Sequence, residues 1–347
     1  MTYPRIPVLR RTLLTGAAAL AATTLAPQAR AAEQVVVGTS GGDYAQLLTD
    51  NIDKPLLAPA GTEVLQDVAS QEPRKTKLIA ERTSRRGSMD VACLSDVDLY
   101  TMSQLNVWEP ITEANVPNLV HVPKAYRTPY AIPHIISGKV MLYGPKKVPT
   151  PPAAFADLWD GKYAGRIGLI DIQYLYVIAI ATLAHGGTMS DFSAGKKALM
   201  DLKKLNPKIY PSNETFAAGM KSEEVWIGPM WLARGVFWKN NGIDLAWSVP
   251  KEGAIAYVSG AGVPKNAQNK ANGLAYLNAM LDPRAQVGFA KSMSYAPTVD
   301  NASVAPDLMK AIGFTPEQAA NLKYPDFDYL AKNTSALLDF WNKEFKA

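Results

Sequence analysis

The stretch from Gln34 to Tyr44 is QVVVGTSGGDY, and it decides how the rest of the chain is interpreted. Its three valines predict a buried β-strand, and the glycines that follow predict a tight turn. Apolar residues then recur at helical spacing, at Leu47, Leu48 and Ile52. A strand, a turn and a helix in this order predict an α/β fold.

The glycine turn at 38–42 also matches the G-x-S-x-G pattern of a hydrolase nucleophile elbow, with Ser40 as the nucleophile. An elbow serine needs a histidine base and an oxyanion hole, and it normally follows several strands. Ser40 follows the first strand, so no earlier strand and loop supplies an oxyanion donor. The pattern therefore favours a loop that holds a ligand, and a secreted serine hydrolase remains the alternative.

Residues 1–31 have the pattern of an export signal. Arg10 and Arg11 precede an apolar run, and Ala29-Arg30-Ala31 is a small-x-small cleavage pattern. We therefore predict a twin-arginine signal peptide and a periplasmic location. Removing its four arginines leaves 32 basic against 31 acidic residues, so the net charge falls from +5 to +1. Such a neutral chain argues against nucleic acid as the main partner.

Further strands and helices alternate along the chain, which predicts a largely parallel α/β sheet. Strands are expected at 64–68, 89–94 and 167–170, and helices at 75–86, 175–183 and 274–281. A stretch rich in proline at 130–148 and two short strands within 246–262 interrupt this alternation. These two stretches predict crossings between two domains, a number that also fits the length of the chain.

Six basic residues lie between positions 74 and 86, interspersed with acids on a predicted helix. Mixed charge of this kind is typical of a solvated face, so the cluster is interpreted as surface: Arg74, Lys75, Lys77, Arg82, Arg85 and Arg86. Cys93, the single cysteine, lies in an apolar run and is expected to be buried.

No spacing of histidines, cysteines or carboxylates fits a metal site, and no nucleotide-binding motif is present, so neither a metal nor a cofactor is expected. Aromatic residues are more informative. Four of the seven tryptophans fall within one short stretch: Trp226, Trp231, Trp238 and Trp247. As a group they are candidates for the wall of an apolar pocket that encloses a small solute, although core packing is the alternative for each of them.

Several segments, in the same order, resemble the periplasmic solute-binding proteins of ABC importers, and most closely their spermidine/putrescine-binding branch. They are VVVGTSGGDY (35–44), TPYAIP (128–133), PTPPAAFADLWDGKYAGRIGLID (149–171), VPKEGAIAYVSGAGVPKNAQNKANGLAYLNAMLDPRAQ (249–286) and SYAPT (294–298). The resemblance implies a two-lobed α/β fold of the type II periplasmic-binding-protein kind with two crossing hinge strands. It also implies a monomer that closes over one solute and delivers it to a membrane permease. The expected lobes are 32–131 plus 256–300, and 132–255 plus 301–347.

The resemblance also carries the polyamine pocket onto this chain, with departures. An acid of that pocket matches Asp171, but a glutamate one helical turn later falls at Tyr174. The tryptophan of the family's W-N-G segment matches Trp231, and its W-x-D pair falls at Tyr257 and Ser259. A serine of the first lobe matches Ser95, with Asp96 beside it.

Two of the three matched acids are therefore neutral here, and a buried ammonium without a carboxylate is costly. Arg234 would add a cation if it faces the cleft. We accordingly expect a small solute that carries a carboxylate or is zwitterionic, with a polyamine as the alternative. Arg234 or the Ser40–Gly42 amides would take the anion, and Asp171 or Asp96 the amine. The candidate ligand-binding residues are Thr39, Ser40, Gly41, Ser95, Asp96, Asp171, Tyr174, Trp231, Arg234, Tyr257 and Ser259.

Overall fold

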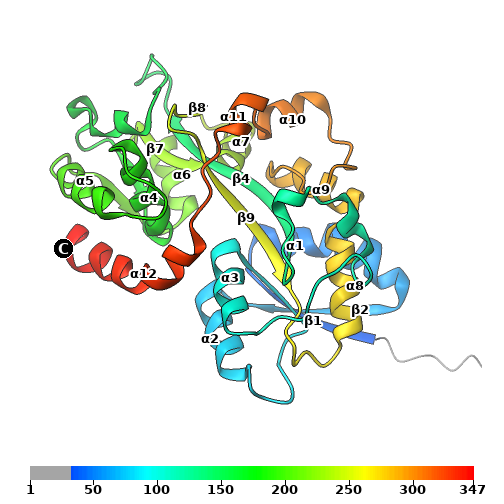
Figure 1. Ribbon diagram of the computed structural model, residues 1–347. Helices are drawn as coiled ribbons and strands as arrows, with labels where there is room; N and C mark the ends of the chain where they lie inside the picture. The colour runs from blue at the N-terminus through cyan, green and yellow to red at the C-terminus, as the bar shows by residue number, and fades with distance from the viewer. Residues whose placement is uncertain (1–32) are drawn as a thin grey trace, which may run out of the picture. The chain divides into compact units, whose positions relative to one another are not determined.

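The computed structural model describes residues 33–347, and the predicted signal peptide lies outside the described residues (Figure 1). The strands are β1 (Glu33–Thr39), β2 (Thr62–Val68), β3 (Val91–Ser95), β4 (Ile132–Tyr143), β5 (Gly168–Ile170), β6 (Lys208–Tyr210), β7 (Ile227–Trp231), β8 (Ala246–Ser248) and β9 (Ile255–Gly262). The α-helices are α1 (Asp43–Leu48), α2 (Gln71–Glu81), α3 (Asp96–Gln104), α4 (Tyr174–Ala184), α5 (Ser193–Lys203), α6 (Asn213–Lys221), α7 (Leu232–Asn240), α8 (Lys270–Met280), α9 (Pro283–Met293), α10 (Pro306–Ile312), α11 (Pro316–Ala320) and α12 (Phe327–Phe340).

Further helical segments join these elements. They are η1 (Thr49–Leu57), η2 (Ala58–Ala60), η3 (Pro117–His121), η4 (Lys124–Tyr126), η5 (Phe155–Trp159), η6 (Gly161–Tyr163), η7 (Asp171–Gln173) and η8 (Trp341–Phe345). Within the described part of the chain, no helix combines the length and apolar character needed to cross a bilayer.

The opening strand, turn and helix form as predicted. β1 leads into α1, and η1 continues that helix to Leu57. Gly42 precedes the helix with a φ of 68°, a left-handed conformation that glycine adopts without a steric penalty. The expected strand at 64–68 and the expected helices at 175–183 and 274–281 are also confirmed, as β2, α4 and α8.

The main sheet has the strand order β2-β1-β3-β9-β4-β7, and β8 also pairs with β4. Only the pairs of β1 with β2 and with β3 are parallel in this sheet. The pairs of β3 with β9, and of β4 with β7, β8 and β9, are antiparallel. The prediction of a largely parallel sheet is therefore wrong, because β4 and β9 run through the middle of the sheet in opposite directions.

β4 and β9 are the two crossing strands predicted from 130–148 and 246–262. In Figure 1 they run between the half of the molecule that carries β1–β3 and the half that carries β5–β8. All 12 residues of β4 are buried. Its first part, from Ile132 to Lys139, pairs with β9, and its last part pairs with β7 and β8. One continuous strand therefore belongs to the cores of both halves.

Four clusters of buried apolar side chains stabilise the fold. One packs β1, η1, α8 and α9, and a second lies among α2, α3 and β3. The other two pack α4, α5 and α12 around β5, and α6, α7 and α10 around β7. Cys93 is buried in the first of these clusters, as predicted.

The basic cluster at 74–86 is not wholly a solvated face, which corrects that interpretation. Arg74 is only 2% exposed, and its guanidinium donates to the backbone carbonyls of Cys93 and Ala69, both at 2.6 Å. Lys75 is paired with two carboxylates in a partly buried position. Arg82, Arg85 and Arg86 are exposed as expected. The predicted helix at 75–86 begins earlier, at Gln71, and ends at Glu81.

The close approach of the crossing strands gives a stability prediction. A Cβ at Gly260 would lie 2.0 Å from the carbonyl oxygen of Ile132, which belongs to the neighbouring backbone of β4. We expect Gly260→Ala to lower the free energy of unfolding by about 1–3 kcal/mol, because β4 and β9 have to separate. Gly144→Ala is the matched control, since nothing lies within 4 Å of its added Cβ. Urea unfolding measures both, and equal stabilities for the two variants would contradict the prediction.

Candidate functional site

Two adjoining cavities form the candidate site. The larger has a volume of about 340 Å³ and the smaller about 150 Å³. Four residues line both of them: Gln71, Asn213, Trp231 and Tyr257. We refer to the two cavities together as the cleft.

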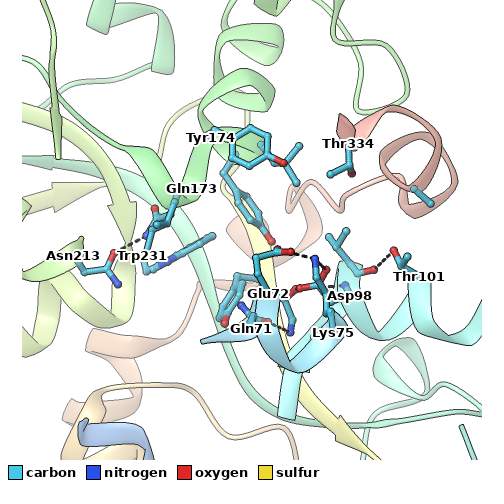
Figure 2. Close-up of a pocket in the computed structure, with 17 residues that line it drawn as sticks. Gln71, Glu72, Lys75, Asp98, Thr101, Gln173, Tyr174, Asn213, Trp231 and Thr334 are labelled. Atoms are coloured by element: carbon cyan, nitrogen blue, oxygen red, sulfur yellow. Dashed lines mark hydrogen bonds and ion pairs between the residues drawn. The ribbon is translucent and has the colours of Figure 1, made fainter. Parts of the chain in front are cut away.

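Side chains from both ends of the crossing strands line this cleft. α2 and the start of α3 contribute from the half with β1–β3. The starts of α4 and α6, the end of β7 and one face of α12 contribute from the other half. Tyr257 comes from β9 itself. Figure 2 shows the charged side chains of α2 and α3 on one side and the Gln173–Asn213 pair on the other, with Trp231 beside that pair.

A network of three charges lies at the α2–α3 end of the larger cavity. The ammonium of Lys75 lies 2.7 Å from a carboxylate oxygen of Glu72 and 2.9 Å from one of Asp98. Ser95, the N-cap of α3, donates to the other oxygen of Asp98 at 3.1 Å. Burial works to lower the pKa of Lys75, but the two carboxylates more than offset this and hold the pKa above its ordinary value. The network carries one net negative charge.

Three aromatic rings form the middle of the cleft. The Tyr257 ring stacks on Trp231 with centroids 4.6 Å apart, and Tyr176 meets Trp231 edge-on at 4.7 Å. The hydroxyl of Tyr176 is buried and has no hydrogen-bond partner among the described residues. Burial raises its pKa well above the ordinary value, so the phenol stays neutral and keeps a proton to donate.

Arg234 of α7 lines the smaller cavity. Its Nε is buried without a hydrogen-bond partner, and no carboxylate of residues 33–347 forms an ion pair with it. Tyr295 lines the same cavity; burial raises the pKa of its phenol, and the neighbouring guanidinium of Arg234 opposes that shift. A cation with no carboxylate partner in the described chain and with an unused Nε donor therefore lies at this end of the cleft.

Most of the candidate residues from the sequence are brought together here. Ser95 and Tyr174 line the larger cavity, Ser40, Arg234 and Ser259 line the smaller, and Trp231 and Tyr257 line both. Thr39, Gly41, Asp96 and Asp171 line neither cavity. Thr39 is fully buried within the sheet, and Gly41 is exposed on the turn.

Asp171 is held away from the cleft by the C-terminal segment. Its carboxylate accepts hydrogen bonds from Nε1 of Trp341 at 2.6 Å and from Nζ of Lys346 at 2.9 Å. Burial works to raise the pKa of Asp171, but these two donors hold it below its ordinary value. The carboxylate already has a cation, so the structure gives it a partner other than a ligand amine.

Asp96 lies at the crossing strands and lines a different cavity. Its carboxylate accepts from the backbone amide of Val97 at 2.8 Å and from that of Val258 in β9 at 3.3 Å. Asp96 thus connects α3 to a crossing strand, and the acid of α3 that lines the cleft is Asp98, two residues further along the helix.

Of the four clustered tryptophans, only Trp231 lines the cleft. Trp238 is buried in the core against Phe216, while Trp226 and Trp247 lie against the basic side chains of Arg166 and Lys239. The expectation of a grouped aromatic wall is wrong for these three. The side chains that sequence reasoning missed are Gln71, Glu72, Lys75, Asp98, Tyr176 and Asn213. The mixed charges of Glu72 and Lys75 and the Asp-x-Asp after β3 were the available signals.

The structure offers Ser40 no histidine. His134 is bonded to Tyr44, His121 to Asp300, and His185 to the carbonyl of Ala181. None of the three histidines, all of which lie in the described range, forms a hydrogen bond with Ser40. The arrangement of base and nucleophile that the hydrolase alternative requires is therefore not formed.

The fold agrees with comparisons to known proteins. Residues 68–316, more than half of the chain, match the family described as bacterial extracellular solute-binding protein. This chain belongs to that family. The spermidine/putrescine-binding periplasmic protein of Escherichia coli K12 is 26% identical over 239 residues, which cover 65% of this chain and 68% of the relative.

Solved structures agree on the fold. The GABA receptor Atu4243 superposes with a TM-score of 0.79 at 19% identity, covering 91% of this chain and 98% of that one. The spermidine/putrescine-binding protein PotD of Streptococcus pneumoniae superposes with a TM-score of 0.74 at 20% identity, covering 90% and 98%. The chain is thus a bacterial extracellular solute-binding protein with a mixed α/β fold of the two-lobed periplasmic type, as predicted. The family and fold are those of periplasmic transport proteins, which are not enzymes.

Asp96 gives a pH prediction. Burial raises its pKa to about 7, and the amide hydrogen bonds of Val97 and Val258 only partly oppose this. The folded state then binds a proton that the unfolded chain releases, so this contribution to stability is full below about pH 4 and is lost as the pH rises to about 7. We expect the unfolding free energy of the wild type, minus that of Asp96→Asn, to fall over this window. Urea titrations from pH 4 to pH 8 measure this difference in unfolding free energy. A difference that does not change with pH would refute the raised pKa of Asp96.

Proposed function

We propose that this solute-binding protein captures a small zwitterion, with one carboxylate and one ammonium, in the cleft. The observation that carries the proposal is the separation of charge along the cleft. An unpaired Arg234 stands at one end, and the Glu72–Lys75–Asp98 network with one net negative charge stands at the other.

The anionic end of the ligand is assigned to Arg234. A guanidinium pairs with a carboxylate through two parallel hydrogen bonds, and a partly buried one that has no carboxylate partner gains the most from such a pair. Ser40, Tyr295 and Asn213 line the same cavity and add neutral donors. The same charge disfavours a second ammonium in this position, because two cations would be enclosed together.

The ammonium end is assigned to Asp98 and Glu72. Lys75 already neutralises one of these two carboxylates, so the network balances one further positive charge. A diamine or triamine would leave at least one buried ammonium without a counterion, which costs several kcal/mol. The rings of Trp231 and Tyr257 between the two ends suit an alkyl segment.

The similar proteins do not decide the ligand. The curated relative from Escherichia coli is named for spermidine and putrescine, whereas the structural neighbour with a TM-score of 0.79 is a GABA receptor. Proteins of this fold are thus named for a polycation and for a zwitterion, so the ligand is inferred here from the side chains of the cleft. A polyamine ligand is the second candidate, supported by the names of the sequence relatives.

We propose capture by hinge closure about β4 and β9, with the lobes 32–131 plus 256–300 and 132–255 plus 301–347. Three of the four core clusters draw almost entirely on one of these sets, which supports the division. α3 and α12 meet beside the cleft, where Tyr100 stacks on Phe327 with centroids 5.5 Å apart. The protein would be exported by the twin-arginine route, act as a monomer and deliver its solute to a permease.

A set of probes of equal length tests the ligand class. We expect 4-aminobutanoate to raise the melting temperature and to bind with a lower Kd than putrescine or succinate, because only the zwitterion matches both ends of the cleft. A ligand at about 100 times its Kd stabilises the fold by about 2.7 kcal/mol, which a thermal-shift assay detects. Calorimetry then ranks the Kd values. Binding of putrescine alone would replace this proposal with the polyamine function.

Two substitutions test the two ends. Arg234→Gln and Asp98→Asn should each weaken 4-aminobutanoate binding by about tenfold to hundredfold, since each removes a charge-assisted hydrogen bond. Arg82→Gln is the control, because Arg82 is exposed on the far end of α2. Arg234→Gln should also bring the Kd for 4-aminobutanoate closer to that for putrescine. Asp98→Asn should bring the Kd for 4-aminobutanoate closer to that for succinate. Equal effects of both variants on all three probes would contradict the assignment of the ends.

A further inference from the structure

A lysine lies behind the wall of the cleft, and the proposed function makes no use of it. Lys139, near the end of β4, is fully buried, and no carboxylate among the described residues pairs with it. Its ammonium nitrogen lies 4.2 Å from the centroid of the Trp231 ring, whose other neighbours form the cleft. Burial of an amine without a counterion is costly, so the hydrogen bonds that Lys139 makes are expected to have a function in the cleft.

Lys139 donates to the side-chain carbonyl oxygen of Gln173, and the carbonyl of Pro229 lies 3.5 Å from the same nitrogen. Burial lowers the pKa of Lys139 well below its ordinary value, but the amine carries N–H bonds in either protonation state. Two carbonyl oxygens around one nitrogen require it to donate. The Gln173 amide is therefore held with Oε1 toward Lys139.

The orientation of Gln173 sets that of the next amide. With Oε1 toward the lysine, the Nε2 group of Gln173 donates to Oδ1 of Asn213 at 2.6 Å. The Asn213 amide, on the first residue of α6, is then oriented with Oδ1 toward Gln173 and Nδ2 on its other side, and Asn213 lines both cavities of the cleft. Figure 2 shows this pair beside Trp231, with the oxygen of Asn213 turned to Gln173.

We propose that Lys139 and Gln173 are positioning residues that fix Asn213 as a hydrogen-bond donor to the ligand, and so make this wall of the cleft select an acceptor such as a carboxylate. Lys139 lines neither cavity and therefore acts through its neighbours, whereas Gln173 lines the larger cavity beside Asn213. The class of ligand rests on the proposed function, but the direction of the hydrogen bonds does not.

The direction alternates along the chain of groups because each amide has one donor side and one acceptor side. If a group early in this chain could only accept hydrogen bonds, the donor and acceptor sides of every later amide would be exchanged. Gln173→Glu does this at the second position: one carboxylate oxygen accepts from Lys139, and the other accepts from Asn213. The Asn213 amide must then turn its Nδ2 toward position 173 and its Oδ1 toward the cleft. The substitution also provides Lys139 with a counterion, so it is not expected to unfold the protein.

The first experiment needs no ligand. In the wild type, the Nδ2 protons of Asn213 face the cleft and should exchange rapidly with water, as followed by ¹⁵N NMR of the side-chain amides. Gln173→Glu should slow this exchange about tenfold or more, because the protons become hydrogen-bonded to a buried carboxylate. Protected Asn213 protons in the wild type, or the same exchange rate in both proteins, would overturn the proposal whatever the ligand proves to be.

The second experiment measures selectivity with 4-aminobutanoate and putrescine. Gln173→Glu should lower the preference for 4-aminobutanoate over putrescine about tenfold to hundredfold, because an acceptor replaces the donor that faces the carboxylate. Lys139→Met should lower this preference less, since the substitution removes the donor that orients the Gln173 amide and lets the amide take either orientation. In an Asn213→Ala background, Gln173→Glu should change the preference for 4-aminobutanoate over putrescine by less than twofold, because the Asn213 amide whose orientation it alters has been removed.

The outcomes separate the two proposals. A loss of affinity for both probes to the same degree, or a Gln173→Glu effect that persists in the Asn213→Ala background, would reduce Lys139 and Gln173 to packing residues. If exchange changes as expected and the wild type binds putrescine alone, the orientation of Asn213 stands and the proposed zwitterion is wrong.

Discussion

The antiparallel pairing of β4 with β9 is the constraint on which the rest of the structure depends. The two strands pair from Ile132 to Lys139, and they approach so closely at Gly260 that a single Cβ would meet the neighbouring backbone. The residues beyond each end of this ladder build separate cores. Tyr257 of β9 lies in the cleft, and Lys139 of β4 lies behind it, so the ladder that joins the two halves also supplies the floor of the site.

The unpaired positive charge and the net negative charge lie at opposite ends of the cleft. Lys75 draws the Glu72 and Asp98 carboxylates together at one end, and Arg234 remains without a carboxylate at the other. Between them, neutral phenols and amides supply the polar contacts, because burial keeps the Tyr176 and Tyr257 protons in place. Such an arrangement discriminates by the position of charge, and shape alone would not separate a diamine from an amino acid of the same length.

How much could be predicted from the sequence differs between the fold and the site. β1, α1 and the two crossing stretches were predictable, since apolar periodicity and glycine or proline interruptions are local signals. The direction of pairing was not, because alternation of strands and helices does not record that β9 returns between β3 and β4. Resemblance placed Ser95, Trp231 and Tyr257 in the cleft, but it gave Asp171 the role of an anchor although Lys346 and Trp341 occupy that carboxylate.

By itself, the sequence determined an α/β fold with two crossings, because buried strands and turns leave local signals that can be seen residue by residue. The resemblance of several ordered segments to solute-binding proteins indicated the family. Only the tertiary structure decided which charges face the ligand. Arg74 and Lys75 are neighbours in one basic run, yet one is buried behind β3 and the other meets Asp98 in the cleft. Side-chain direction depends on packing between segments far apart in the chain, and the pairing of Gln173 with Lys139 and Asn213 arises in the same way.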